Sequence, residues 1–516
     1  MAAWIKAMDV AELPAPGMRR VELEGVAVLL VNAGDDRIRA FGADCPHAGA
    51  PLEKGALCEG RIVCPWHKGA FSIDSGAWLE PPPLEGLTSY PVRVDTDAIF
   101  VELEPQRTVR APTTHAGPAS RFAVIGGGAA GAAALATLLE SDLACEVTLF
   151  AAEPQAPYDR TCLSKFVPAG EMPPDEVPPV LPESVMHDPR LRIDHTEVRH
   201  FDVQTKKVTL ADGYETAFDA VLLATGSVAK RPDIPGADLG NIYTLRNLKD
   251  AGAILDALAP NDHAAILGDS FIALETASAL RKRGVEVTLV APGGPPLQRV
   301  LGERVGAMFR DWHEANGVVF RHAKALRFKG AQAVEAVELD DGSSLPAKAV
   351  IVGIGVRPAT EFVSGLDIGE DGGLDVDATM RVGSGEIYAA GDIARFPLGG
   401  AMPSAQRTRI EHWRVAQQHG RIAALNMMGR NVRYEGVPFF WTQHYDKRVE
   451  YLGHAGQWDD LVISGRAGDE RFGVLYVGAG RVLAVLACGF EREMAILSER
   501  MRETLSADAV RGILGF

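Results

Sequence analysis

Residues 124–131 read Val-Ile-Gly-Gly-Gly-Ala-Ala-Gly and decide the fold of the central part of this chain. They follow an apolar segment over residues 121–125 and precede an alanine- and leucine-rich segment that ends near residue 140. In such a strand–turn–helix unit, Gly126 permits a tight turn, Gly128 lets the backbone approach a pyrophosphate, and Gly131 lets the helix pack on the strand. The helix N-terminus then faces the phosphates. The sequence therefore predicts a dinucleotide-binding α/β unit.

Residues after the following strands extend this predicted site. Glu153 comes after a strand predicted over residues 146–150 and suits the hydroxyl groups of a ribose. The tripeptide after an apolar strand over residues 220–223 is Ala224-Thr225-Gly226. Asp392 ends a strand that begins at residue 387, where a carboxylate can bind a ribityl or ribose hydroxyl. These pieces favour a flavin over a free nicotinamide nucleotide at this first site.

A second, altered fingerprint lies about 140 residues later. Gly268 is kept, while Ser270 and Ala273 replace the second and third glycines, between a strand predicted over residues 263–267 and a helix over residues 273–283. Serine is small enough for a pyrophosphate to approach, and alanine is accepted at the third position. The strand over residues 286–290 is followed by Ala291 rather than by an acid or an arginine, so this segment does not choose between NADH and NADPH. The alternative is a domain that no longer binds a nucleotide.

Two short cysteine–histidine motifs precede the glycine fingerprints. They are Cys45-Pro46-His47 and Cys64-Pro65-Trp66-His67, with 16 residues between them. Cys45, His47, Cys64 and His67 could hold zinc tetrahedrally, or a Rieske [2Fe–2S] cluster with two thiolates on one iron and two imidazoles on the other. The C-x-H and C-x-x-H grouping matches the Rieske signature closely and zinc-finger spacings poorly. A purely structural role is the third possibility.

Composition places these motifs in a folded, acidic, multidomain protein. The chain has 516 residues, 52 Lys and Arg, 68 Asp and Glu, and a formal net charge of −16, which speaks against nucleic-acid binding. Six cysteines are too few for a disulfide scaffold. Residues 122–139 carry no charge, but their four glycines and many alanines argue against a membrane span. With no N-terminal targeting signal recognised, we expect a cytoplasmic protein.

The motif order resembles a known family. Residues 121–430 are similar to flavoprotein pyridine-nucleotide reductases of the ferredoxin-reductase and apoptosis-inducing-factor type, and the whole chain resembles the Rieske-containing proteins of the latter type. The motifs that carry the resemblance are Pro157-Tyr158-Asp159-Arg160, Leu163-Ser164-Lys165, Leu301-Gly302-Glu303-Arg304-Val305-Gly306, Gly353-Ile354-Gly355, Ala389-Ala390-Gly391-Asp392, Glu411-His412-Trp413 and Pro438-Phe439-Phe440-Trp441. They run in family order over nearly the whole chain.

The resemblance implies a fold and a set of sites. The fold is a β-rich Rieske domain (residues 1–104), a linker (105–120), a Rossmann-like FAD domain (121–245 and 357–431), a Rossmann-like NAD(P) domain (246–356) and a C-terminal α+β interface domain (432–516). Lys165 is expected near flavin N5, paired with Glu275, where a cation would stabilise an anionic reduced flavin. The other implied FAD residues are Gly126, Gly128, Gly131, Glu153, Arg160, Val198, Ala224, Thr225, Gly226 and Asp392, with Glu411, His412, Trp413 and Trp441 lining the ring. The expected nicotinamide residues are Gly268, Ser270, Ala273, Glu275 and Gly353.

The resulting hypothesis is an enzyme that passes electrons from NAD(P)H, with NADH slightly preferred, through FAD to the Rieske cluster. The acceptor would be an oxygenase, a ferredoxin or a cytochrome, and the chain a monomer or homodimer without nucleic-acid or membrane partners. The linker is long enough to allow a tethered, mobile Rieske domain. Two alternatives stay open: a flavin–thiol peroxidase or oxidase that uses Cys162, and an NADH-responsive redox sensor.

Overall fold

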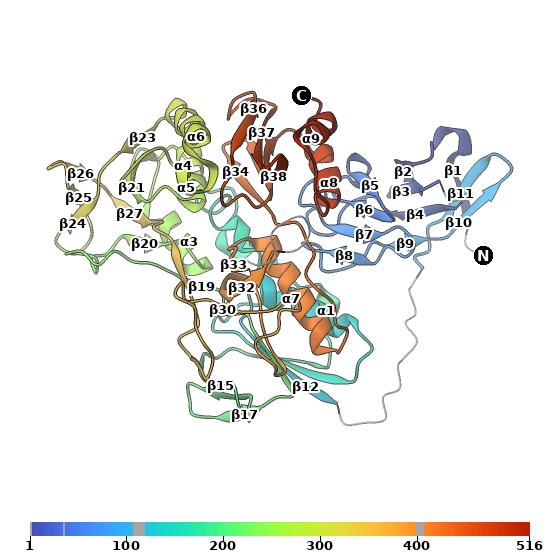
Figure 1. Ribbon diagram of the computed structural model, residues 1–516, viewed down its shortest axis with the longest axis horizontal. Coiled ribbons are helices and arrows are strands. Elements are labelled where there is room, and N and C mark those ends of the chain that lie inside the picture. Colours follow the sequence, from blue (N-terminus) through green and yellow to red (C-terminus); the bar gives the residue numbers. More distant parts are fainter. Residues whose placement is uncertain (1–2, 35–36, 107–118, 399–406) are drawn as a thin grey trace.

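The computed structural model describes residues 3–34, 37–106, 119–398 and 407–516. In Figure 1 an N-terminal β-rich region lies at one end and the second α/β region at the other, while the C-terminal sheet lies between them, above the first α/β region. Most of the predicted linker, residues 107–118, lies outside the described residues. Among the described helices, none is both long and apolar enough to span a bilayer.

Three antiparallel sheets form the N-terminal region, in keeping with the short apolar runs and turn residues of its sequence. One contains β1 (Trp4–Asp9), β10 (Val92–Asp95) and β11 (Ala98–Glu102). Another contains β2 (Gly17–Leu23), β3 (Val26–Asn32), β4 (Ile38–Gly42) and β9 (Ser89–Tyr90). The last contains β5 (Ala56–Cys58), β6 (Arg61–Val63), β7 (Ala70–Ser72) and β8 (Trp78–Glu80). The loops after β4 and β6 carry the two cysteine–histidine motifs.

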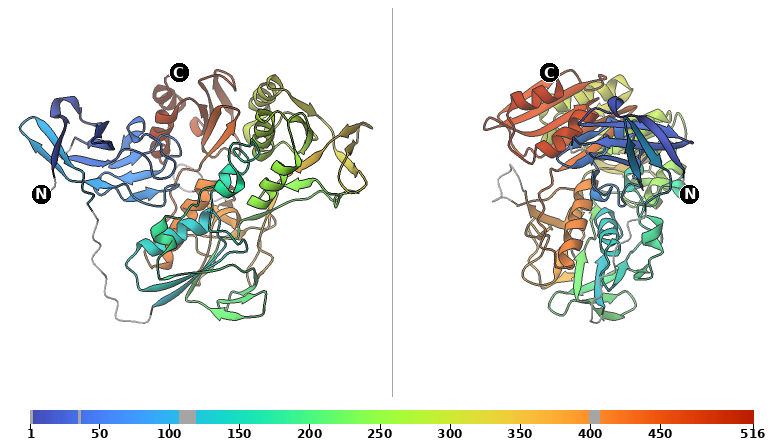
Figure 2. Two further views of the ribbon diagram at one scale, coloured as in Figure 1. Left: turned by 180° about the vertical axis from the view of Figure 1, so that it is seen from behind. Right: turned by 90° about the vertical axis from the view of Figure 1, so that its right-hand side faces the viewer.

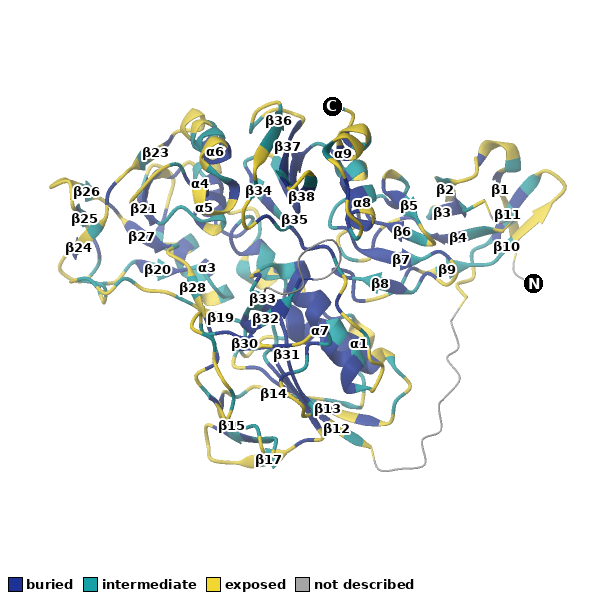
Figure 3. Ribbon diagram, in the orientation of Figure 1, coloured by how far each residue is buried: buried dark blue, intermediate teal, exposed yellow. Residues whose placement is uncertain are grey.

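The first α/β region is built on a five-stranded parallel sheet in the order β14-β13-β12-β18-β31. Its strands are β12 (Ser120–Ile125), β13 (Cys145–Phe150), β14 (Leu191–Asp194), β18 (Ala220–Leu223) and β31 (Ile387–Ala389). Two adjacent helices, α1 (Ala129–Glu140) and α7 (Trp413–Met427), are deeply buried (Figure 3). A Cβ at Gly420 of α7 would lie 1.9 Å from the carbonyl oxygen of Ala130, so glycine there allows α7 to pack directly on α1.

The second α/β region repeats this plan with the parallel order β20-β27-β21-β22-β23. Its strands are β20 (Ile242–Thr244), β21 (His263–Leu267), β22 (Glu286–Val290), β23 (Val318–Arg321) and β27 (Ala349–Val352). Its helices are α3 (Leu248–Ala257), α4 (Phe271–Lys282), α5 (Gln298–Leu301) and α6 (Glu303–Ala315). The helix predicted to begin at residue 273 begins at Phe271, because the Ser270 hydroxyl caps it by accepting from the Ala273 N–H.

Smaller sheets and one short helix, α2 (Glu183–Met186), complete these two regions. One sheet has β15 (Val198–Asp202), β16 (Lys207–Leu210), β17 (Glu215–Ala217) and β29 (Val363–Ser364), and another has β24 (Ala325–Lys329), β25 (Ala336–Leu339) and β26 (Ser344–Pro346). A two-stranded ribbon of β19 (Ser227–Ala229) and β28 (Val356–Pro358) joins the two α/β regions. The remaining small sheet contains β30 (Leu374–Asp375), β32 (Ala394–Pro397) and β33 (Arg407–Thr408).

The C-terminal sheet is antiparallel in the order β34-β35-β38-β37-β36, followed by α8 (Glu491–Arg500) and α9 (Ala507–Leu514). Its strands are β34 (Phe439–His444), β35 (Lys447–Gly453), β36 (Asp460–Ser464), β37 (Phe472–Gly478) and β38 (Arg481–Cys488). Alternate residues of each strand point to opposite faces of this sheet, and both faces are covered. Phe440 and Tyr451 pack in the core of the second α/β region, and Phe439 and Leu452 pack in the core formed with α8 and α9. On its other side α8 meets the N-terminal region, where Ala495 packs on Ala56, Val63 and Ala70 (Figure 2).

Candidate functional site

The turn between β12 and α1 has the shape that the first glycine fingerprint predicts. Gly126 has φ +113°, and a Cβ there would lie 2.2 Å from the carbonyl oxygen of Ala224. A Cβ at Gly131 would lie 2.0 Å from the carbonyl oxygen of Gly126. At Gly128, by contrast, a Cβ would meet nothing within 4 Å, and this residue caps α1 without a side-chain hydrogen bond. The helix N-terminus therefore faces open space that a phosphate can fill.

That space is part of a cavity of about 710 Å³, within the size range of ligand-binding pockets. Most of the residues predicted to bind FAD line it: Gly126, Gly128, Glu153, Arg160, Val198, Ala224, Thr225, Gly226, Asp392, Glu411, His412 and Trp413. Of the remaining predicted residues, Gly131 lies beneath the turn, and Lys165 and Trp441 are described below.

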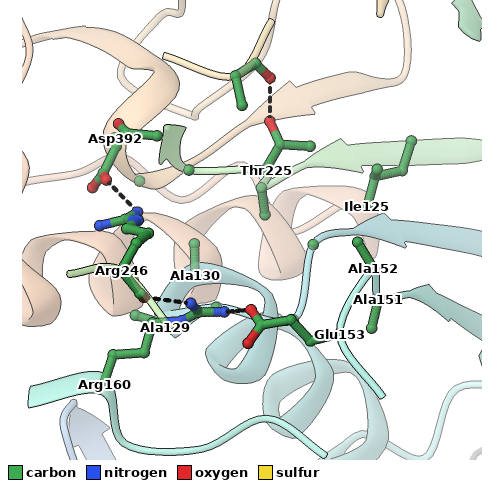
Figure 4. A pocket seen from close by; sticks show the side chains of 18 of the residues that line it. Ile125, Ala129, Ala130, Ala151, Ala152, Glu153, Arg160, Thr225, Arg246 and Asp392 are labelled. Atoms are coloured by element: carbon green, nitrogen blue, oxygen red, sulfur yellow. Dashed lines mark hydrogen bonds and ion pairs between the residues drawn. The ribbon is translucent and has the colours of Figure 1, made fainter. Parts of the chain in front are cut away.

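Charged side chains along the cavity hold one another in place (Figure 4). Glu153 accepts a hydrogen bond from the Tyr158 hydroxyl (2.6 Å) and also pairs with Arg160. Arg160 donates to the backbone carbonyl of Arg246 (2.9 Å), whose guanidinium lies 3.0 Å from Asp392. Glu153, which suits a ribose, and Asp392, which suits a ribityl chain, are therefore both held in place. The cavity is pre-shaped for a long, polyhydroxylated nucleotide such as FAD.

Lys165 and Glu275 form a buried ion pair with 3.1 Å between Nζ and Oε2. Their side chains are 8% and 3% exposed, so the pair is shielded from water. Glu275 also accepts from the Ser164 hydroxyl (2.6 Å), the Thr442 hydroxyl (2.6 Å) and the Gln443 N–H (3.1 Å). The structure thus brings together the two residues predicted to act as a pair, although 110 positions separate them.

The second fingerprint forms a similar turn, but its helix is capped. Gly268 has φ +112°, and a Cβ there would lie 2.3 Å from the carbonyl oxygen of Gly353. The Ser270 hydroxyl donates to that same carbonyl (3.2 Å) and accepts from the Ala273 N–H (3.2 Å). Gly268, Ser270, Ala273 and Gly353 therefore meet at the start of α4, where the Ser270 hydroxyl already satisfies one of the helix N–H groups.

The two cysteine–histidine motifs come together in pairs. Cys45 and Cys64 are close enough for each thiol to shift the pKa of the other, and the Nδ1 atoms of His47 and His67 lie 3.1 Å apart. Two nitrogens that are each about 2.1 Å from one metal ion lie roughly 3 Å apart. A thiol pair beside an imidazole pair therefore fits the ligand set of a [2Fe–2S] cluster. Across the residues that the structure describes, no three His, Cys, Asp or Glu are grouped to hold a single metal ion.

The protonation of these side chains suits metal ligation. Burial raises the pKa of the Cys64 thiol, but hydrogen bonds from Cys45 and from the backbone N–H groups of His67 and Trp66 lower it further, to about 7. Burial also lowers the pKa of His47 and of His67 below its ordinary value. The interaction with Cys64, together with burial, raises the pKa of Cys45, so only one thiol of the pair ionises readily without a metal. Three of the four side chains therefore favour the forms that bind metals, which are an ionised thiol and neutral imidazoles.

The histidine edge of this ligand set faces the flavin-type cavity. His67 packs on Trp441 with 4.2 Å between ring centroids. His47 lines a small cavity of about 130 Å³ together with Asp159 and Trp413, and Trp413 also lines the large cavity. Trp441, predicted to line the flavin ring, therefore contacts His67, one of the predicted cluster ligands. Trp413 lines both cavities.

A buried polar interface holds the N-terminal region in this position. The fully buried ammonium of Lys68 donates to Glu450 of β35 (2.9 Å) and to the backbone carbonyl of Glu491 (3.3 Å). Arg414 of α7 donates to the backbone carbonyls of Pro81 and Lys68, both at 2.9 Å. The N-terminal region is therefore bound to both the first α/β region and the C-terminal sheet.

Glu80 of β8 is the second anion of this interface. It accepts from Gln418 (2.7 Å) and Arg502 (3.1 Å) and lies 3.8 Å from Arg414. Burial raises its pKa, but the two guanidinium groups and Gln418 lower it further, so the net pKa lies below the ordinary value. Glu80 is therefore ionised in the docked protein at neutral pH.

Comparison with known proteins places this geometry in a family. Residues 120–420, more than half of the chain, match the family model described as pyridine nucleotide-disulphide oxidoreductase. The chain belongs to this family. Residues 3–91 match the Rieske [2Fe-2S] domain model, and residues 439–511 match the reductase C-terminal model. These matches confirm the predicted fold class and support FAD, NAD(P)H and a [2Fe–2S] cluster as the bound groups of an oxidoreductase.

Individual relatives agree with this assignment. Apoptosis-inducing factor 3 of Mus musculus is 31% identical over 507 residues, which cover 95% of this chain and 82% of the relative. The biphenyl dioxygenase system ferredoxin–NAD(+) reductase component of Paraburkholderia xenovorans is 35% identical over 391 residues, covering 75% and 94%. The crystal structure of a covalent putidaredoxin reductase–putidaredoxin complex superimposes with a TM-score of 0.70 at 26% identity, covering 76% of this chain and 96% of that one.

Sequence reasoning missed several residues of the site. Arg246 lies between predicted motifs, and only its pairing with Asp392 marks it. Lys68 and Glu450 are 382 positions apart, and no local pattern connects them. For Cys162 the structure gives a physical answer: the thiol is 4% exposed, and burial raises its pKa to about 12. It is therefore protonated at neutral pH and a poor nucleophile.

Proposed function

We propose that this chain is a ferredoxin-reductase-type enzyme that oxidises NAD(P)H and delivers the electrons through its own Rieske cluster to a redox protein. When bound, FAD takes up hydride and gives up electrons singly, whereas the [2Fe–2S] cluster carries one electron at a time. The observation that carries the proposal is the position of Trp413, which lines both the large cavity beside the glycine fingerprint and the small cavity beside His47. Donor and acceptor sites thus share a wall within one chain.

The roles proposed for the side chains follow from their contacts. The turn at Gly126, Gly128 and Gly131 would bind the pyrophosphate of FAD, and Glu153 and Asp392 would bind its hydroxyl groups. Figure 4 shows Arg160 and Arg246 beside these two acids, where they hold the carboxylates in position. The buried pair of Lys165 and Glu275 would set the charge near the reacting ring.

Two aromatic residues would control water at this site. His412 stacks on Phe440 with 4.0 Å between ring centroids, and burial lowers the pKa of His412 to about 4. A neutral, stacked imidazole adds no charge to the wall of the ring pocket. Trp441 covers His67, so the cluster ligands are shielded from solvent where they face the reductase.

For the nucleotide we propose NADH, because several relatives are named ferredoxin–NAD(+) reductases. One contact argues for NADPH. The Ala291 N–H donates to the backbone carbonyl of Arg321 (3.1 Å), so Arg321, the last residue of β23, lies beside the end of β22, where the acid expected for NADH is missing. Steady-state kcat/KM with NADH and with NADPH separates the two. A preference for NADPH that is lost in Arg321→Ala would overturn the NADH assignment.

The relatives also indicate the kind of partner. Several are named as reductase components of dioxygenase systems, and one structural neighbour is a covalent complex of putidaredoxin reductase with putidaredoxin. We propose that the acceptor here is likewise a redox protein, either an oxygenase, a ferredoxin or a cytochrome. The Rieske module in the same chain would then take the place of a separate ferredoxin.

The test replaces a cluster ligand. His67→Ala should abolish reduction of a protein acceptor such as cytochrome c and spare NAD(P)H-dependent reduction of ferricyanide, which takes electrons directly from the flavin. The control is His200→Ala, an exposed histidine on β15. Cytochrome reduction that survives in His67→Ala would show that the cluster is not in the path. Very slow turnover with an NADH-induced change in oligomer size would instead favour the redox-sensor alternative.

A further inference from the structure

A chain of hydrogen bonds leads away from the carboxylate of Glu275. The Thr442 hydroxyl lies 2.6 Å from Glu275 Oε1 and 3.1 Å from His444 Nε2. His444 Nδ1 lies 3.1 Å from His313 Nε2, and His313 Nδ1 lies 3.0 Å from the Tyr445 hydroxyl. Five side chains from α4, α6 and β34 with its following turn thus form one unbranched path.

The path runs from the core toward the surface. Thr442, His444 and His313 are 1%, 0% and 0% exposed, Tyr445 is half-buried, and the next residue along the chain, Asp446, is exposed. The rings of Phe309 and Trp312 pack against the histidines and wall them off. Such an apolar sheath leaves side-chain hydrogen bonds as the route for a proton.

Hydrogen-bonding requirements fix the direction of every donor. A carboxylate only accepts, so Thr442 donates to Glu275 and must accept from the Nε2–H of His444. His444 then accepts at Nδ1 from the Nε2–H of His313, which accepts at Nδ1 from Tyr445. Both imidazoles are neutral in this arrangement, in agreement with burial, which lowers the pKa of His444 to about 3 and that of His313 well below its ordinary value.

The turn that places Tyr445 is strained. Tyr445 has φ +57°, in the left-handed region where a bulky residue is uncommon and where hairpin turns usually carry Asn or Gly. Its N–H donates to the hydroxyl of Ser278 on α4, the helix that also carries Glu275. Strained residues cluster where function requires a particular position. This turn conformation places the tyrosine hydroxyl 3.0 Å from His313 Nδ1.

We propose that Thr442, His444, His313 and Tyr445 conduct protons between Glu275 and solvent during turnover. The inference rests on the proposed function, since oxidation of NAD(P)H by single-electron transfer gives NAD(P)⁺, two electrons and one proton, and that proton must leave a buried site. Lys165 donates to Glu275 Oε2, and the proposed function places Lys165 near the reacting ring, so it would link the chain to the reaction site.

The transfer balances with one proton entering and one leaving. Release starts from the reversed donor arrangement, in which Thr442 points its hydrogen to His444 Nε2 and each imidazole carries its hydrogen on Nδ1. Before each release the hydroxyl groups rotate and the imidazoles exchange their hydrogen between the two ring nitrogens to reach this arrangement. Protonated Glu275 then gives its hydrogen to Thr442, whose own hydrogen passes to His444 Nε2. The Nδ1 hydrogen of His444 passes to His313 Nε2, the Nδ1 hydrogen of His313 passes to Tyr445, and Tyr445 releases its hydrogen to water. No group is oxidised or reduced, and the products are a carboxylate and the donor arrangement seen in the structure. The charged groups acting on the path are Lys165 and Glu275 at its inner end and Arg281 near Tyr445.

The test breaks the path at both ends in the full-length holoprotein. Tyr445→Phe and Thr442→Val keep the size of each side chain and remove its hydroxyl. In a single turnover with NADH and cytochrome c, a pH indicator should show proton release lagging electron delivery by about tenfold or more in both variants. Tyr476→Phe, which removes a buried hydroxyl bonded to the Leu301 carbonyl, is the control and should show no lag. Proton release that keeps pace with electron delivery in Tyr445→Phe would overturn the proposal.

A second readout needs no turnover. In oxidised protein with histidines labelled with nitrogen-15, magnetic resonance should find His313 and His444 neutral with hydrogen on Nε2, and Tyr445→Phe should shift the Nδ1 resonance of His313. A cationic ring, or an Nδ1 resonance that does not move, contradicts the path. If wild-type protein fails to reduce cytochrome c, the proposed function fails, while this measurement still decides on the path.

Discussion

Glu80→Gln is the most informative single change at the interface between the Rieske module and the reductase. Glutamine keeps the size of the side chain and removes one charge. Arg414, 3% exposed, and Arg502, 26% exposed, would then face a neutral amide in place of the carboxylate that they share. The prediction is that docking of the Rieske module weakens while each folded part stays intact.

The magnitude follows from the burial of the three side chains. Removing one partner of a fully buried ion pair costs about 3–5 kcal/mol. Because Glu80 is 16% exposed and Arg502 is a quarter exposed, part of the charge is already solvated, and we expect about 2–4 kcal/mol. At about 1.4 kcal/mol for each factor of ten, the ratio of docked to undocked protein should fall by roughly 30- to 1,000-fold.

The assay follows docking through electron transfer. Protein is mixed anaerobically with NADH in a stopped-flow instrument over a series of urea concentrations below the unfolding range. The cluster signal reports docking, and the flavin signal in the same record reports the reductase alone. In Glu80→Gln, cluster reduction should fail at a lower urea concentration than in wild type, while flavin reduction is unchanged.

The control is Glu22→Gln, which removes an exposed carboxylate paired with Arg20 on the same module. It should behave as wild type. If Glu80→Gln loses cluster reduction at the same urea concentration as wild type, and small-angle scattering finds both equally compact, then the buried charges at Glu80 do not hold the module and the reasoning is refuted.

Three further changes test other parts of the account. Gly131→Ala should lower the flavin content of the purified protein, because its Cβ would lie 2.0 Å from the Gly126 carbonyl oxygen and push α1 away from the turn. Cys162→Ser should leave peroxide-dependent NADH consumption unchanged, because the buried thiol is protonated. His419→Leu should make the protein less sensitive to acid. Burial lowers the pKa of His419 to about 3, so the unfolded state binds a proton more readily, and the free energy of unfolding falls by about 2 kcal/mol between pH 7 and pH 5. The measurement is the melting temperature at pH 7 and at pH 5.

Each of these has a result that contradicts it. Full flavin occupancy in Gly131→Ala would mean that the turn does not need glycine. The control is Gly512→Ala in α9, where a Cβ meets nothing within 4 Å and φ is not positive. Peroxide-dependent NADH consumption that is present in wild type and lost in Cys162→Ser would revive the peroxidase alternative. Neither ring nitrogen of His419 has a hydrogen-bond partner among the described residues. If the melting temperature of His419→Leu falls between pH 7 and pH 5 by as much as that of wild type, the buried imidazole does not cause the acid sensitivity.

The parts of the fold that the sequence predicts well depend on local rules. The strands over residues 263–267 and 286–290 coincide with β21 and β22 because each is a short apolar run bounded by turn residues. The glycine turns follow from steric limits that only glycine meets. The sequence pattern places the start of α4 two residues late, because the apolar residues do not show that Ser270 caps the helix.

The parts that the sequence does not predict join distant segments. His313 and His444 are 131 positions apart, and Lys68 and Glu450 are 382 apart. A single buried histidine or lysine leaves no periodic pattern in the sequence, so nothing local indicates its distant partner. The position of the Rieske module on the reductase is set by such contacts, which appear only once the chain is folded.

The central claim is that electrons cross from the reductase to the Rieske module within one chain. An anaerobic NADH titration of the purified protein, followed by visible absorption and by low-temperature electron paramagnetic resonance, tests it most directly. The account predicts that the flavin bleaches and that the reduced-cluster signal rises in the same protein without any partner. A bleached flavin beside a cluster that stays oxidised would contradict the docked arrangement around Trp413 and Trp441 as the path.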